Sequence, residues 1–153
     1  MSIDDILAIL GTPAQQVFWL ATLFVCGIGL AFGDRSVRIG VVLVLANFIL
    51  SRLTEGLVWQ TIRASVTVLD GLLFGLLVVL AWRSRRWWAH GAAAFALLSF
   101  LAHFIALFDQ TVWWRAYVGL GWYFSAAVVV AILVGVAETP LARRYERWAS
   151  QHL

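Results

Sequence analysis

Five long apolar segments, separated by short polar stretches, constrain the fold of this chain more than any other feature of its sequence. An α-helix rises about 1.5 Å per residue, so about 20 residues cross the hydrocarbon core of a bilayer. The segments cover roughly residues 13–33, 37–55, 63–82, 87–108 and 115–137. The sequence therefore predicts an all-α fold: a polytopic integral membrane bundle of five transmembrane helices, forming one domain over residues 1–153.

The composition indicates lipid as the solvent of this fold. Of the 153 residues, 63% are hydrophobic and 12% are charged, whereas soluble domains are about 45–50% apolar and about 25% charged. A soluble domain of this size leaves about 30% of its unfolded-chain surface in water, and this chain has too few polar residues to cover it. The lipid bilayer is therefore the expected partner, and the scattered net charge of +3 argues against nucleic acid.

Local signals place the start of the first crossing. In "TPAQ", Thr12 can cap the helix, Pro13 suits its first position, and Gln15 completes a capping box. A cleaved signal peptide would begin with basic residues. Asp4 and Asp5 stand there instead, so we expect the first helix to be retained.

Two short amphipathic helices are predicted to flank the bundle, over residues 2–10 and 139–153. The C-terminal helix carries Leu141, Tyr145 and Trp148 on a face opposite its arginines. Such a basic amphipathic helix is typical of an anchor on an anionic cytoplasmic leaflet, and docking to a protein partner is the alternative.

The arginines predict the orientation, since loops rich in basic residues stay in the cytoplasm. Eight of the eleven fall on one side of the predicted topology: Arg35, Arg38, Arg83, Arg85, Arg86, Arg143, Arg144 and Arg147. The other side has Arg52, Arg63 and Arg115. The N-terminus is therefore expected outside and the C-terminus in the cytoplasm, in a bacterial inner membrane. Tryptophans are expected at both interfaces, with Trp82, Trp87 and Trp88 at the inner one and Trp59, Trp113 and Trp114 at the outer one.

Three polar residues from three different crossings are predicted to share one layer of the membrane. Asn47, Asp70 and His103 each lie a few residues from the outer end of their segment, roughly 8–12 Å below the outer surface. Burying an ionisable group at such depth has an unfavourable free energy unless the group is paired or hydrated. Ionisable residues inside a membrane are therefore candidates for function. We therefore predict an intramembrane polar, ligand or proton site from these three residues.

The helical spacing of small and polar residues extends this candidate site. Ser51 shares a face with Asn47, Ser99 shares a face with His103, and Tyr117 begins the fifth crossing near the same layer. Faces of small and polar residues mark the side of a membrane helix that packs against other helices. Two GxxxG spacings predict further packing positions: Gly29, Gly33, Gly71 and Gly75.

Several roles for this layer remain open. The side chains can hydrogen-bond one another and fix the register of the helices. They can instead form a proton or small-cation site, or a pocket for a small polar ligand, with Asp70 either protonated or ionised against His103, Arg52 or Arg63. Haem is a further option, although His90 and His103 lie about 140° apart on one helix, so a haem at His103 would need a dimer.

The absence of known catalytic motifs favours a non-catalytic role. The chain has no HExxH, no GxSxG and no phosphate-binding loop, so we predict no metal site and no cofactor besides the haem option. We expect an accessory or scaffold subunit of a membrane complex, with protein partner subunits or a homo-oligomer. A small permease or a proton- or ligand-binding membrane protein is the first alternative, and a membrane enzyme using acid–base chemistry is the second.

Overall fold

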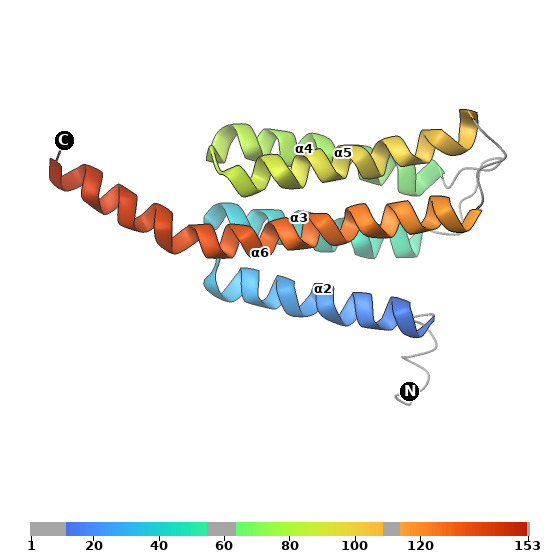
Figure 1. Cartoon of the computed structure of the whole chain (residues 1–153), viewed down its shortest axis with the longest axis horizontal. Coiled ribbons are helices and arrows are strands. Elements are labelled where there is room, and N and C mark those ends of the chain that lie inside the picture. Colours follow the sequence, from blue (N-terminus) through green and yellow to red (C-terminus); the bar gives the residue numbers. More distant parts are fainter. Residues whose placement is uncertain (1–11, 55–63, 109–113, 153) are drawn as a thin grey trace.

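Five α-helices make up the computed structural model, which describes residues 12–54, 64–108 and 114–152. They are α2 (Pro13–Phe32), α3 (Arg35–Leu53), α4 (Ala64–Ser84), α5 (Trp87–Phe108) and α6 (Trp114–His152). The helices run side by side along the long axis of the molecule (Figure 1). The all-α prediction is confirmed, while the predicted helix over residues 2–10 lies outside the described residues.

Capping side chains fix the first residues of α2 and α3. Thr12 accepts a hydrogen bond from the Gln15 amide at 3.4 Å, and the Gln15 side chain accepts one from the Thr12 amide at 2.7 Å, so the predicted capping box is confirmed. Asp34 caps α3 by accepting from the Val37 amide at 2.9 Å. This cap starts α3 at Arg35, two residues earlier than the apolar pattern alone predicts.

Four of these helices are long and apolar enough to cross a membrane: α2, α3, α4 and α6. Helix α5 has 22 residues, and two histidines and two tryptophans are among them. It packs most extensively against α4 and α6 and runs from the end where α4 finishes to the end where α6 begins (Figure 1). If α4 and α6 cross a membrane, α5 must cross it between them, which is consistent with a multi-pass membrane protein.

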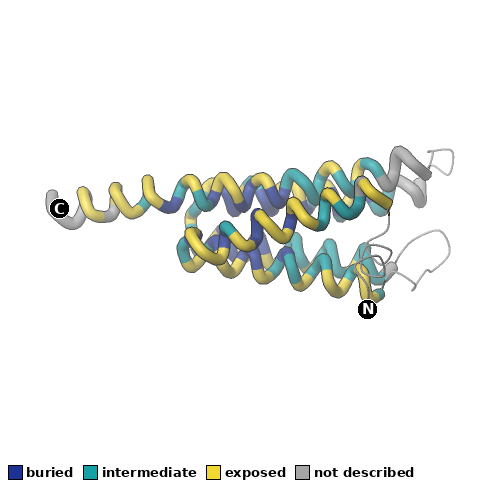
Figure 2. The backbone as a smooth tube through the Cα atoms, turned by 90° about the horizontal axis from the view of Figure 1, so that it is seen from below, coloured by how far each residue is buried: buried dark blue, intermediate teal, exposed yellow. Residues whose placement is uncertain are grey.

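Many large apolar side chains point out of the bundle, as expected for helices in lipid. On α4, for example, Val68, Leu72 and Val79 are 61%, 57% and 49% exposed. The fully buried segments concentrate in the half of the bundle nearer the turns that join α2 to α3 and α4 to α5 (Figure 2). We term this the arginine-rich end, since it has Arg35, Arg38, Arg83, Arg85, Arg86 and Arg143.

Trp88 organises the core at the arginine-rich end. A Cβ atom added at Gly40 of α3 would lie 2.5 Å from its ring, and one added at Gly135 of α6 would lie 2.7 Å away. The two glycines therefore let α3 and α6 close on the indole. Trp88 is only 2% exposed, so its ring fills the core and does not face the lipid head groups of the predicted interfacial belt. Trp82 and Trp87 are 79% and 85% exposed, as that belt requires.

Three of the four predicted packing glycines lie in close contacts. A Cβ at Gly29 would lie 2.7 Å from Val41, one at Gly71 would lie 3.0 Å from Phe100, and Gly33 is as crowded. Gly75 is the exception, because it is exposed and nothing lies within 4 Å of its Cβ position. The GxxxG spacing around Gly75 therefore does not mark a contact with another described residue.

Helix α6 is longer than predicted. The expected crossing over 115–137 and the expected amphipathic helix over 139–153 belong to one continuous helix as far as His152, and this helix includes Pro140. Its C-terminal part extends beyond the bundle at the arginine-rich end (Figure 1). Pro140 removes one backbone hydrogen bond and kinks a helix without necessarily ending it. Leu141, Tyr145 and Trp148 are 64%, 70% and 55% exposed on this extension.

Candidate functional site

Polar side chains from three helices surround the carboxylate of Asp70 in the second turn of α4. We term them the Asp70 cluster: Asn47 of α3, Asp70 of α4, and Ser99 and His103 of α5. Ser99 and His103 are four residues apart, so they share one face of α5. Ala92 and Ala96, which continue that face, are 0% and 2% exposed, so this stripe points inward as predicted.

Both oxygens of Asp70 have partners within the chain. Asn47 Nδ2 donates to Oδ1 at 3.1 Å, and Ser99 Oγ donates to Oδ2 at 2.8 Å. His103 Nε2 lies 3.2 Å from the same Oδ2, as a hydrogen bond from the ring N–H or as an ion pair when the ring is protonated. The side chains of Asp70 and His103 are 13% and 11% exposed. Partners of this kind offset the cost of holding a carboxylate away from water.

A small cavity of about 20 Å³ lies beside the Asp70 cluster. Its polar lining comes from Asn47, Asp70, Ser99 and Ser125, and Ser125 adds the fourth helix, α6. A water molecule needs at least about 10–15 Å³ on this measure and two to four polar partners. The cavity therefore has the size and lining for about one water molecule.

The structure does not bring every predicted residue into this cluster. Ser51 Oγ is buried without a hydrogen-bond partner among the described residues, and it is not bonded to Asp70. Arg52 is exposed near the end of α3. The side chain of Tyr117 and all of Arg63 lie outside the described part of the chain. Ser125 was not predicted, although it is the only serine in the apolar run of the fifth crossing.

The two histidines of α5 have separate environments. His90 lies at the arginine-rich end, where its Nδ1 is 2.8 Å from the Arg86 carbonyl oxygen. His103 belongs to the Asp70 cluster, so the two rings do not face one site. Within residues 12–54, 64–108 and 114–152, no group of three or more His, Cys, Asp or Glu side chains could hold a metal ion.

A second polar cluster, absent from the sequence prediction, joins the α2–α3 turn and the α4–α5 turn to α6 at the arginine-rich end. Arg86 Nη2 lies 3.3 Å from Asp34 Oδ2, and Arg86 Nη1 lies 3.9 Å from Glu138 Oε1. Thr139 Oγ1 accepts a hydrogen bond from the Asp34 amide at 3.4 Å, and Glu138 accepts one from the Trp88 amide at 3.4 Å. In the sequence, the only sign of this cluster is that Asp34 and Glu138 lie at the predicted end that also holds most of the arginines.

Comparison with known proteins gives no relative for this chain: no family model, no curated protein and no solved structure matches it. The coarse class comes from the fold, whose four apolar helices of membrane-spanning length are consistent with a multi-pass membrane protein.

Proposed function

We propose that this protein is a non-catalytic accessory or scaffold subunit of a complex in a bacterial inner membrane. One observation carries the proposal: both oxygens of the Asp70 carboxylate are bonded by side chains of this same chain. Interhelical hydrogen bonds of this kind hold membrane helices in register. The adjoining 20 Å³ cavity is far below the roughly 300–1,000 Å³ typical of a small-molecule pocket.

The extension of α6 supports a role in assembly. Its apolar side chains, Leu141, Tyr145 and Trp148, are exposed beyond the bundle. The same segment carries Arg143, Arg144 and Arg147, and the positive-inside rule favours a cytoplasmic position for this end. Such a basic amphipathic helix can bind a partner subunit or the cytoplasmic leaflet of the membrane.

Native mass spectrometry of the protein, extracted gently from its own membrane, tests the scaffold proposal. We expect a second protein at fixed stoichiometry. The Asp70→Asn variant should lower the fraction of complex, because it weakens the joint between α3, α4 and α5. Ser84→Ala is the matched control, since the Ser84 hydroxyl is buried without a hydrogen-bond partner among the described residues. A wild-type protein that is always recovered alone would contradict the proposal.

A proton-binding or small permease function is the second candidate, favoured by the pair of titratable side chains beside a water-sized cavity. His103 and Asp70 lie 3.2 Å apart, and the hydroxyls of Ser99 and Ser125 line the adjoining space. In proteoliposomes with an internal pH dye, this function predicts proton flux that Asp70→Asn abolishes and Ser84→Ala retains. Flux that persists in a folded Asp70→Asn protein would eliminate this candidate.

A further inference from the structure

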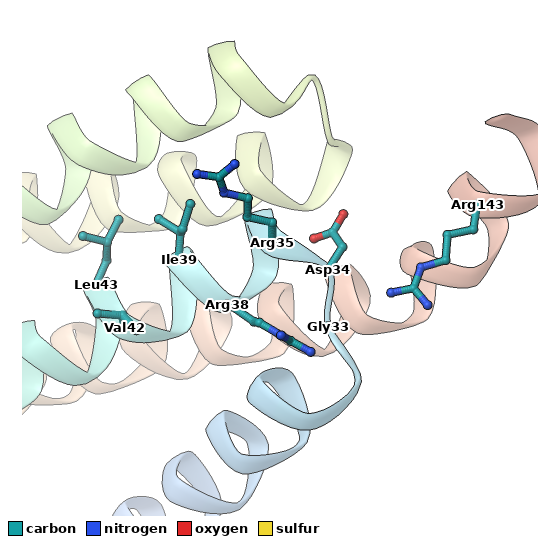
Figure 3. Close-up of a pocket in the computed structure, with 8 residues that line it drawn as sticks. All are labelled: Gly33, Asp34, Arg35, Arg38, Ile39, Val42, Leu43 and Arg143. Carbon is teal, nitrogen blue, oxygen red and sulfur yellow. The ribbon is translucent and has the colours of Figure 1, made fainter.

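A large open cavity lies at the arginine-rich end, away from the Asp70 cluster. It has a volume of about 480 Å³ and lies along α3, beside the α2–α3 turn and the extension of α6. Its lining residues are Gly33, Asp34, Arg35, Arg38, Ile39, Val42, Leu43 and Arg143 (Figure 3). Basic groups at one end of the lining and apolar groups at the other give the cavity an amphipathic character.

The side chains of Arg38 and Arg143 extend toward the α2–α3 turn from opposite sides, whereas Arg35 extends from the other side of α3 (Figure 3). All three side chains are exposed, and none forms an ion pair with another residue of the described ranges. Asp34, the acidic member of the lining, is already bonded to Val37, Ser36 and Arg86. The cavity therefore has an excess of positive charge.

The apolar part of the lining runs from these arginines toward the middle of the bundle. Ile39, Val42 and Leu43 are spaced by three and four residues, so they share one face of α3. Ile39 and Val42 are 43% and 57% exposed, as expected for side chains that contact lipid tails. Basic pockets between membrane helices at the cytoplasmic side are typical binding sites for anionic lipid head groups.

We propose that this cavity binds an anionic phospholipid, with its phosphate between Arg38 and Arg143 and an acyl chain along Ile39 and Val42. Guanidinium groups form strong, bidentate hydrogen bonds to phosphate oxygens. Such a lipid joins α3 to the extension of α6 and so fixes the direction in which that extension leaves the bundle. The site is independent of the Asp70 cluster and of the scaffold function proposed above.

Native mass spectrometry of the detergent-purified protein, titrated with phosphatidylglycerol or with phosphatidylcholine of the same chains, tests this site. We expect one tightly held phosphatidylglycerol, and about tenfold weaker binding in Arg38→Gln and in Arg143→Gln. Arg83→Gln is the matched control, because Arg83 is exposed at the same end and does not line the cavity. It makes the same change of charge and should bind phosphatidylglycerol as the wild type does.

Three outcomes would overturn the proposal. The first is equal binding of the two lipids, and the second is an equal loss of phosphatidylglycerol binding in Arg83→Gln. The third is competition by inorganic phosphate at equal concentration, which would assign the arginines to a free anion. Because Arg38 and Arg143 are both exposed, their variants are expected to fold, and circular dichroism checks each one. If either Arg38→Gln or Arg143→Gln fails to fold, the other variant is compared with Arg83→Gln.

Discussion

The hydroxyl of Ser99 offers a quantitative test of the Asp70 cluster. Its 2.8 Å hydrogen bond to Asp70 Oδ2 joins α5 to α4. Interhelical hydrogen bonds in membrane proteins contribute about 0.6 kcal/mol on average and up to about 1.7 kcal/mol. We expect Ser99→Ala to lower the free energy of unfolding by an amount within this range. The short distance and the 6% exposure of Ser99 favour the upper part.

The assay is unfolding in mixed micelles, followed by helical circular dichroism, with Ser84→Ala as the control. Ser84 undergoes the same chemical change, but its buried Oγ has no hydrogen-bond partner among the described residues. Removing an unsatisfied hydroxyl is neutral or stabilising. A double-mutant cycle of Ser99→Ala with Asp70→Ala, which removes the acceptor, should give a coupling energy of about 1 kcal/mol. Equal effects of the two alanine variants, or strict additivity in the cycle, would refute the reasoning.

Three other predictions follow from the packing and the charges. Gly40→Ala should destabilise the fold by about 1–3 kcal/mol in thermal unfolding, because the new methyl group overlaps the Trp88 ring, whereas Gly75→Ala should be neutral or stabilising. Arg86→Gln should lower the free energy of unfolding by on the order of 1 kcal/mol at low ionic strength. Added salt should reduce this difference, and a difference that salt does not change would contradict an ionic contribution. The purified protein should show no Soret band, because His103 Nε2 is engaged by Asp70, and a Soret band that His103→Ala removes would contradict this.

The sequence was sufficient to predict the fold class and to group Asn47, Asp70 and His103, because both predictions depend on residue counts along helices. The 1.5 Å rise of a helix converts residue counts into depths. Asn47, Asp70 and His103 were therefore expected in one layer before any contact was known. Ser99 was found from helical periodicity, and the structure bonds it to Asp70.

Contacts that depend on the rotation of one helix against another were not available from the sequence. Trp87 and Trp88 are adjacent in the sequence, yet the ring of Trp87 is exposed and that of Trp88 is buried. Gly71 and Gly75 share a motif, but only Gly71 meets a neighbouring helix. Similarly, Ser125 reaches the cavity because of how α6 is rotated.

The central claim is that Asp70 joins neighbouring helices through direct side-chain bonds, and its contact with Asn47 can be measured directly. Asn47 is the only asparagine in the chain, so a side-chain ¹⁵N label on asparagine reports on one site. In bilayers, with protein from cell-free synthesis carrying ¹³Cγ-aspartate, solid-state dipolar recoupling should dephase this amide strongly, as a 3.1 Å contact to Asp70 Oδ1 requires. The dephasing should vanish in Asp70→Ala. An amide that is not dephased in the wild type would contradict the account.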